Sequence, residues 1–298
     1  MKNPAASVLE RLRNKAKKLN MSYQHCLQLF VQEEFLRRLS LSSYHSHLVL
    51  KGGLFLYSLT RFQSRATMDV DFLMRGMPNT EQAVQKMVND ILREETGYSF
   101  VSFTCGQVKP IAQEKKYHGL SVQLIGYIQN VRVPFSIDMG VGDIIFPKAQ
   151  IREIYALLPD EQAPRILTYS LESTIAEKFQ AMLHLLELNS RMKDFYDIYD
   201  LSLRFAFDGA QLQNAIRTTL QNRTTTVNAQ TLPRLIQLSE NETMKQKWQH
   251  FLRTIHEEQM PFEQVTVQLL RFLSPVITAI AADTAFHNTW QPEIGWQK

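Results

Sequence analysis

The residues with the clearest chemical potential are two aspartates, Asp69 and Asp71, in an apolar stretch that predicts a β-strand over about 68–74. Alternate side chains of a strand share a face, so we expect both carboxylates on one side while Met68 and its apolar neighbours face the core. Adjacent like charges repel, and burying them costs free energy. A divalent cation removes that cost, and ligation by oxygen alone suits Mg2+. The pair therefore predicts a metal site for phosphoryl-type chemistry.

A glycine pair, Gly52-Gly53, precedes the aspartates. Ser42 or Ser43 is a candidate cap for a helix that reaches this pair. Glycines at the end of a helix let a phosphate approach the backbone closely, and their N–H groups can bind it. The structural alternative is a glycine that only ends the helix, followed by a solvated edge strand.

A later predicted strand ends at Asp138. A third carboxylate from a neighbouring strand could complete a two-metal site, in which one ion activates the attacking oxygen and the other holds the triphosphate and its leaving group. Asp138 would then be a metal ligand or general base. Alternatively, it ends the strand or caps the turn at Gly140. We interpret Asp143, in the following loop, as a turn residue.

Ser170 is predicted to cap a helix that carries Glu172, Glu177 and Lys178. Lys178 lies away from the centre of the apolar stripe of this helix, so it could neutralise phosphate charge near a nucleotide. A solvent-exposed face of Glu and Lys residues is the alternative.

Three aspartates, Asp194, Asp197 and Asp200, fall within the next predicted helix, close to Arg191 and Lys193. This pattern is unfavourable, because Asp has a low helix propensity and nearby like charges repel. Compensation by the positive end of the helix explains Asp194 and partly Asp197, but Asp200 less easily.

Composition is that of a soluble globular protein, with 298 residues of which 44% are hydrophobic and 21% charged, enough for one large domain or two. The formal net charge of +4 permits a nucleic-acid or nucleotide partner without requiring one. The cysteines Cys26 and Cys105 lie far apart in sequence, which excludes a disulfide framework and indicates the cytoplasm.

Several site classes lack their sequence signals. The 8 histidines show no zinc-binding spacing, and neither a Walker A loop nor a GxSxG motif occurs. We expect no secretion signal and no membrane span, because the N-terminal residues lack an apolar run and no stretch approaches about 18 uninterrupted apolar residues.

Periodicity divides the chain into an α/β half and a helical half, with a boundary near 150–168. The first half is predicted to contain amphipathic helices at 5–20 and 22–40, a helix at 80–95, and strands at 68–74, 98–104, 120–128 and 131–138. Pro147 at one end and Pro159 or Pro164 at the other are predicted to bracket a connector. After 168 the pattern predicts helices alone, at 170–189, 191–206, 209–221, 228–238, 242–256 and 262–282.

Together these segments resemble the AbiEii family of nucleotidyltransferases, toxins of bacterial type IV toxin–antitoxin and abortive-infection systems. The resemblance spans about residues 50–200. Four stretches carry it, in the order found in the family: Leu50-Lys-Gly-Gly53, Arg65-Ala-Thr-Met-Asp69-Val-Asp71-Phe, Glu172…Ala-Glu177-Lys178-Phe and Arg191-Met-Lys-Asp194-Phe-Tyr-Asp197.

The resemblance implies an α+β fold. A polymerase β-like nucleotidyltransferase domain, a mixed sheet with helices, would occupy 1–165, and an all-helical domain that completes the active site would occupy 166–298. It also implies NTP as substrate and Mg2+ as cofactor. Some similar proteins add nucleotides to tRNA 3′ ends and so block translation, and GTP binding is associated with the family. A cognate antitoxin encoded nearby is a further implied partner.

Functional roles carry over only where the motifs match. Asp69 and Asp71 match the metal-binding pair of the family. Lys178 and Asp194 match its catalytic lysine and aspartate. Asp138 rests instead on the wider polymerase β-like pattern.

Gly52 and Gly53 match the nucleotide-binding glycines, with one departure. The family often has Ser or Thr directly after the pair, whereas this chain has Leu54, so a hydroxyl that would bind triphosphate is missing. Ser64 or Thr67 could replace it. The further candidates for nucleotide binding are therefore Ser64, Arg65 and Thr67.

We expect nucleotidyl transfer from an NTP to an acceptor hydroxyl on RNA, with the tRNA 3′ end as the acceptor. The mild basicity and the Lys- and Arg-bearing helices could contact the phosphate backbone. A protein side chain or small molecule as acceptor is an alternative with the same fold. A non-catalytic nucleotide-binding interaction module, favoured by Leu54, is the alternative of a different class.

Overall fold

The computed structural model describes residues 4–65, 67–111, 119–158, 162–185, 191–228, 230–257 and 260–298. The chain divides into two compact units. The first is Met1–Asp143 with Ala149–Tyr169, and the second is Ile144–Lys148 with Ser170–Lys298.

The first unit is an α/β structure. Its helices are α1 (Pro4–Lys18), α2 (Tyr23–Leu41), α3 (Gly52–Leu59) and α4 (Glu81–Leu92). Its strands are β1 (Leu48–Lys51), β2 (Val70–Met74), β3 (Val101–Ile111), β4 (Gly119–Ile128), β5 (Val131–Gly140), β6 (Gln150–Glu153) and β7 (Arg165–Thr168).

Among the described residues, seven strands form one sheet in the order β3-β4-β5-β2-β1-β7-β6. β2 is parallel to β5 and β1 is parallel to β7, whereas the other neighbours are antiparallel. The expected mixed sheet is therefore present. Along β4 and β5, buried residues alternate with more exposed ones, as in a sheet with one face on the core.

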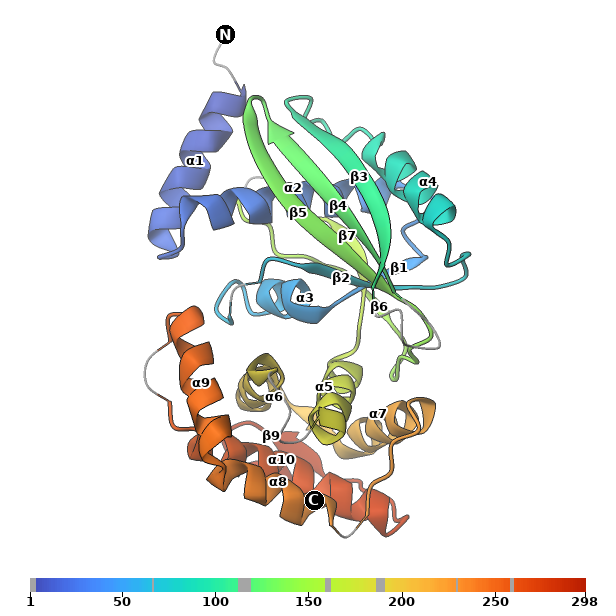
Figure 1. Ribbon diagram of the computed structural model, residues 1–298, viewed down its shortest axis with the longest axis vertical. Coiled ribbons are helices and arrows are strands. Elements are labelled where there is room, and N and C mark those ends of the chain that lie inside the picture. Colours follow the sequence, from blue (N-terminus) through green and yellow to red (C-terminus); the bar gives the residue numbers. More distant parts are fainter. Residues whose placement is uncertain are drawn as a thin grey trace. The chain divides into compact units, whose positions relative to one another are not determined.

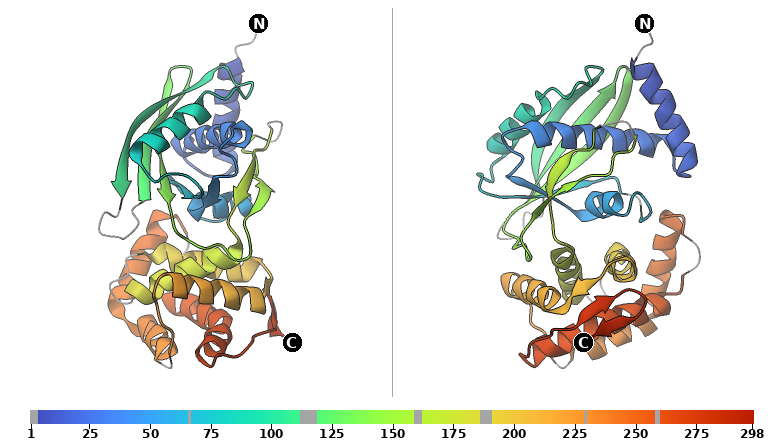
Figure 2. Two further views of the ribbon diagram at one scale, coloured as in Figure 1. Left: turned by 90° about the vertical axis from the view of Figure 1, so that its right-hand side faces the viewer. Right: turned by 180° about the vertical axis from the view of Figure 1, so that it is seen from behind.

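α2 and α4 pack on the buried face of this sheet (Figures 1 and 2). The ring of Phe35 in α2 lies 6.3 Å from that of Phe72 in β2 and 6.4 Å from that of Phe135 in β5, measured between centroids. Because side chains alternate along a strand, the residues next to Phe72 and Phe135 face away from α2. Asp71 is one of them, so it lies on the opposite face of the sheet.

Two sequence predictions for this unit are wrong. Residues 43–47 form turns and 48–51 form β1, so the glycine pair follows a strand and begins α3. The predicted connector also contains β6 and β7, which pair with each other. Each of these strands is only 4 residues long. β1 pairs with β2 and with the distant β7, and residues 154–164 separate β6 from β7, so local periodicity does not reveal these strands.

α2 is more deeply buried than its predicted amphipathic pattern implies, because four charged side chains lie inside the unit. Glu34 is fully buried and contacts Arg37 at 3.3 Å and Arg38 at 3.1 Å. Glu33 pairs with Arg37 and accepts a 2.7 Å hydrogen bond from the Leu157 amide. Buried charges are tolerated when they are paired and hydrogen-bonded.

These arginines also connect α2 to the surrounding chain. Arg37 Nε donates to Gln162 O at 2.7 Å, and Arg38 donates to Val101 O at 2.9 Å and to Leu92 O. The network therefore joins α2 to the end of α4, the start of β3 and the segment before β7.

The second unit is mainly helical. Its helices are α5 (Leu171–Leu185), α6 (Met192–Arg204), α7 (Gly209–Asn222), α8 (Thr231–Glu240), α9 (Glu242–Thr254) and α10 (Phe262–Ala281). The predicted extension of its first helix to 189 lies outside the described residues.

The expectation of an all-helical C-terminal region is wrong in one respect. The strands β8 (Phe207–Asp208), β9 (Thr289–Gln291) and β10 (Gly295–Gln297) form a small antiparallel sheet. Trp290 of β9 is fully buried, and its Nε1 donates to Ser202 O at 2.7 Å. Its ring lies 4.8 Å from that of Phe272. These contacts of Trp290 hold the C-terminal strands against the helical core.

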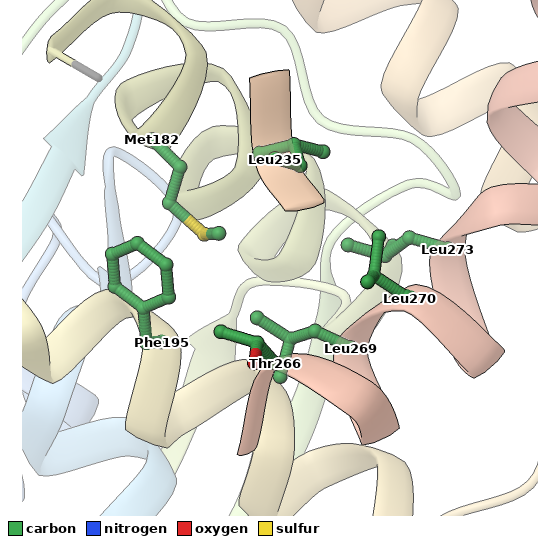
Figure 3. A pocket seen from close by; sticks show the side chains of 7 residues that line it. All are labelled: Met182, Phe195, Leu235, Thr266, Leu269, Leu270 and Leu273. Carbon is green, nitrogen blue, oxygen red and sulfur yellow. The ribbon is translucent and has the colours of Figure 1, made fainter. Parts of the chain in front are cut away.

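The core of the second unit contains a cavity of about 10 Å³ (Figure 3). Its walls are almost entirely apolar and come from α5, α6, α8 and α10: Met182, Phe195, Leu235, Thr266, Leu269, Leu270 and Leu273. This volume is about that of one water-sized probe, so the cavity is a packing gap and cannot hold a nucleotide.

By length and composition, α10 could also cross a membrane, a test that buried core helices of soluble proteins pass as well. Here nine of its residues are buried within the second unit, Phe272 and Val276 completely.

We expect Glu34→Ala to lower the free energy of unfolding by about 3–5 kcal/mol, because Arg37 and Arg38 would remain buried without their shared carboxylate. Chemical denaturation followed by circular dichroism measures the change. Glu242→Ala is the matched control, since this carboxylate is 78% exposed and its pair with Lys245 should matter little. Equal small losses in both variants would contradict a structural role for the α2 network.

Candidate active site

The glycine pair lies where β1 gives way to α3. Gly52 has a φ of +70°, a left-handed conformation that glycine adopts without steric penalty. A Cβ at Gly52 would lie 2.0 Å from Asp71 Oδ2, so the main chain at this turn directly contacts the carboxylate. The predicted end of a helix is thus the beginning of one, and the reading of these glycines as a helix C-cap is wrong.

This reversal changes what the turn can bind. The first N–H groups of a helix have no acceptor within the helix, and this end of the helix dipole is positive. The N-cap residue is Lys51, whose side chain carries no acceptor for them. The turn is therefore suited to an anion such as a phosphate.

Thr67 packs against the second glycine. A Cβ at Gly53 would lie 2.6 Å from Thr67 Oγ1, so only glycine allows this approach. Leu54, in contrast, is 4% exposed and lines the apolar interior of the unit together with Leu29 and Leu36. The side chain that departs from the family pattern thus belongs to the core.

Strand register places four polar residues in one row across the sheet. Asp71 of β2 pairs with Lys51 of β1 on one side and with Asp138 of β5 on the other. Asp138 in turn pairs with Ser121 of β4. Paired residues of neighbouring strands project from the same face, so the row consists of a cation, two carboxylates and a hydroxyl, opposite the face that packs on α2.

Two carboxylates on adjacent strands, roughly 5 Å apart at their backbones, repel each other unless a cation lies between them. In the described part of the chain, no group of three or more His, Cys, Asp or Glu side chains is arranged to hold a metal ion. Mg2+ typically takes one or two protein carboxylates and completes its shell with water and substrate phosphates. The donors in the row therefore fit Mg2+ that binds together with a nucleotide.

The ends of the row are held by further contacts. Ser121 Oγ donates to Asp138 Oδ1 at 2.6 Å, which fixes one carboxylate oxygen. Lys51 Nζ contacts Asp143 Oδ2 at 2.8 Å and lies 5.3 Å from the centre of the Tyr169 ring. Asp143, interpreted from sequence as a turn residue, is therefore the ion-pair partner of the lysine beside the glycine turn.

Asp69 lies just before β2 and is exposed. The residue that precedes it is firmly held, because the buried amides of Gln28 and Gln32 both donate to Met68 O, at 2.7 and 2.8 Å. The side chain of Met68 is 50% exposed, so its predicted core position is wrong. β2 begins only at Val70, and the alternation that would bury Met68 does not extend to it.

The other nucleotide-binding candidates occupy the loop between α3 and β2. Ser64 Oγ is buried and has no hydrogen-bond partner among the described residues. The Ser64 amide donates to Thr60 Oγ1 at 3.1 Å. Arg65 is partly buried in the same loop.

In the second unit, Lys178 of α5 is buried, so its predicted alternative as a solvent-facing residue is wrong. Its Nζ contacts Asp194 Oδ1 at 3.1 Å and Asp197 Oδ2 at 2.6 Å, both on α6. Ser170 Oγ accepts from the Ser173 amide at 3.1 Å, which confirms the predicted cap of α5.

Both aspartates of this cluster are buried, Asp194 completely. Arg191 Nε lies 2.8 Å from Asp194 Oδ2, yet this oxygen accepts no directed hydrogen bond from the described residues. Two cations and two carboxylates therefore balance in charge. The contacts show that the aspartates orient the Lys178 ammonium group.

The negative charge of Asp200, which the sequence pattern did not explain, is paired with an arginine on the same helix. Arg204 Nε lies 2.6 Å from Asp200 Oδ1, one helical turn away. Burial raises the pKa of Asp200, and this arginine opposes that shift.

Sequence comparison identifies the family. Residues 34–269 match the model described as nucleotidyl transferase AbiEii toxin of a type IV toxin–antitoxin system. The chain belongs to the AbiEii family. It is therefore a member of a family of nucleotidyltransferase toxins, and this membership implies a nucleotide substrate and a cognate antitoxin.

Two solved structures from Helicobacter pylori are similar in fold to this AbiEii-family chain. JHP933 is 12% identical with a TM-score of 0.49, and the match covers 88% of this chain and 94% of that one. A protein described as a candidate nucleotidyltransferase is 11% identical with a TM-score of 0.48, covering 88% and 97%. No curated protein sequence matches the chain.

The structure adds residues that sequence reasoning gave no role. Lys51 and Ser121 join the carboxylate row, and Asp197 makes the shortest contact to Lys178. Lys51 and Asp197 lie within the motifs that resemble the family, so their positions could have identified them as site candidates from the sequence. Ser121 is evident only from the register of β4 against β5.

We expect Gly52→Ala to destabilise the AbiEii-family protein by about 1–3 kcal/mol more than Gly97→Ala, because overpacking adds to the backbone strain. Both glycines have positive φ, +70° and +86°, but a Cβ at Gly97 meets nothing within 4 Å. Chemical denaturation measures both variants. Equal losses would show that Asp71 moves aside without cost and that the close approach is incidental.

We expect Lys178→Met to cost about 3–5 kcal/mol of unfolding free energy, since the buried carboxylates of Asp194 and Asp197 would lose the ammonium group that bridges them. Lys245→Met is the matched control. That lysine also bridges two carboxylates, Glu242 at 3.0 Å and Glu263 at 2.8 Å, but on the surface, so its loss should change stability little. Indistinguishable denaturation midpoints would contradict a tightly held Lys178.

Proposed function

We propose that this chain is a Mg2+-dependent nucleotidyltransferase that moves a nucleoside monophosphate from an NTP to an acceptor hydroxyl on RNA. The proposed acceptor is the 3′ end of tRNA, and the consequence is a block of translation and growth. The proposed compartment is the cytoplasm, and a cognate antitoxin encoded nearby would oppose the activity.

The observation that carries this proposal is the register of β2. It sets Asp71 beside Asp138 and against the Gly52 turn at the start of α3. A pair of carboxylates next to backbone donors for phosphate is the arrangement that nucleotidyl transfer requires: one part holds a metal ion and the other holds the phosphate chain.

In this mechanism Asp69 and Asp71 would hold Mg2+ against the phosphates, and Asp138 would act as the general base. When bound, the ion neutralises charge that develops on the triphosphate and its leaving group. The glycine turn would bind phosphate oxygens through N–H groups, and Thr67, beside Gly53, could donate its hydroxyl. Ser64 and Arg65 remain candidates for the same task.

The transfer exchanges one bond for another. The acceptor oxygen attacks the α-phosphorus, the bond from that phosphorus to the bridging oxygen of the β-phosphate breaks, and pyrophosphate leaves with the electron pair. Asp138 would accept the proton of the acceptor hydroxyl and pass it to solvent. Ser121 occupies only Oδ1 of Asp138, which leaves Oδ2 for this role.

The catalytic roles of Lys178 and Asp194 rest on the resemblance to the family and remain predictions. Their support in the structure is indirect: Lys178 is buried and oriented by two aspartates. Such a fixed ammonium group suits the stabilisation of phosphate charge.

We expect Asp71→Asn and Asp138→Asn each to reduce transfer of label from [α-32P]NTP to total tRNA by at least about a hundredfold. The first change weakens the hold on the metal ion, and the second removes the general base. Chelation of Mg2+ by EDTA should abolish labelling in the wild-type protein. Induced expression should stop growth for wild type and spare it for both variants.

Asp283→Asn is the matched control, because Asp283 is 89% exposed in the second unit and its φ of +51° suits asparagine. Labelling by Asp71→Asn at the wild-type rate would refute the mechanism. Label in protein extract rather than tRNA would favour the alternative acceptor. If Asp71→Asn and Asp138→Asn both still bind NTP and the wild-type protein transfers no label to any acceptor, the non-catalytic module is favoured.

A further inference from the structure

The net positive charge of the chain is carried by α1. This helix holds five of the 33 Lys and Arg residues but one of the 29 Asp and Glu residues. Its net charge therefore equals the +4 of the whole chain, and the remaining residues are neutral in sum. The positions concerned are Arg11, Arg13, Lys15, Lys17 and Lys18.

The apolar side of α1 is already covered. Ala5, Val8, Leu12 and Ala16 are buried against the first unit, at 0–5% exposure. Tyr23 and Cys26 of α2 fix the helix through hydrogen bonds to its carbonyls, each 3.2 Å long. α1 is thus a docked helix whose outer side is basic.

Helical spacing arranges these charges in two rows. Arg11, Lys15 and Lys18 follow one another at intervals of four and three residues, and Arg13 and Lys17 are four apart, so each row lies along one side of the helix. The first row is roughly 10 Å long at a rise of 1.5 Å per residue. Arg13, Lys17 and Lys18 are exposed.

We propose that the outer side of α1 is a docking surface for the phosphate backbone of RNA. This inference rests on the proposed function, in which RNA is the acceptor, and it assigns the contact to a helix that precedes the residues matching the family, 34–269. Rows of Lys and Arg bind a regular array of phosphates without reading sequence.

The burial of α1 argues against a lipid surface as the partner. A helix that binds a membrane surface inserts its apolar face between the lipids. Here that face packs within the protein, and only the basic side is presented. The charge alone remains for recognition, which favours a polyanion.

The test compares two triple variants of the full-length protein with equal loss of charge. The first is Lys15→Gln, Lys17→Gln and Lys18→Gln, which keeps side-chain length and helix propensity. The control is Arg132→Gln, Arg234→Gln and Arg253→Gln, three exposed positions on other elements. Fluorescein-labelled tRNA is titrated with each protein at 50–200 mM KCl, with the melting temperature as a check on folding.

We expect the α1 variant to bind tRNA about tenfold or more weakly than wild type, and the control less than twofold. The slope of log K against log[KCl] should become shallower by about 2–3 in the α1 variant, since each lost phosphate contact removes about 0.7–0.9. Equal weakening of tRNA binding in both variants would overturn the proposal. An α1 variant that binds tRNA as tightly as wild type does would also overturn it. So would α1-dependent binding to phosphatidylserine vesicles in place of tRNA.

Asp71→Asn separates this inference from the proposed reaction. It should bind tRNA as wild type does while losing transfer. If Asp71→Asn retains transfer but the α1 variant loses tRNA binding, the docking surface is supported and the proposed mechanism is contradicted. If the α1 variant binds tRNA as wild type does, the docking surface is contradicted, whatever the outcome for transfer.

Discussion

The candidate active site depends on how the short strand β2 is paired. It lies between antiparallel β1 and parallel β5, and this register aligns Lys51, Asp71 and Asp138 in one row. A slip of one residue would turn Asp71 toward α2 and place Phe72 on the polar face. The contacts of Phe35 with Phe72 and Phe135 oppose such a slip, because they hold the apolar side of both strands in the core. Hydrophobic packing on one face thus fixes the chemistry on the other.

Buried charge is handled in two ways in this protein. In α2 and in the Lys178 cluster, each carboxylate has a cation within reach, so these groups are compensated inside the fold. Asp71 and Asp138 face each other across neighbouring strands, with one lysine beside them and a hydroxyl on Asp138. Two carboxylates side by side are donors that fit an additional cation.

α2 links the core to the segment that carries Asp69. Its C-terminal half carries the Glu–Arg network, and its N-terminal half presents Gln28 and Gln32 to Met68 O. α1 docks on the start of the same helix through Tyr23 and Cys26. One buried helix therefore supports the basic surface, the loop before β2 and the packing face of the sheet.

The sequence alone determined the strands β4 and β5, the helices α1, α2 and α4, and the family, because these depend on local periodicity and on motifs of fixed spacing. Asp69 and Asp71 as metal ligands stay a prediction, and β3 begins and ends later than the predicted 98–104. The sequence also indicated Asp138 as a carboxylate from a neighbouring strand. Only the tertiary structure decided that Asp138 lies directly beside Asp71, that Ser121 contacts it, and that Gly52 begins a helix. β1, β6, β7 and the strands that retain Trp290 are 2–4 residues long and exist through their pairing partners. Pairing between distant segments leaves no periodic trace in the chain, so the register that builds the site could not be predicted from sequence.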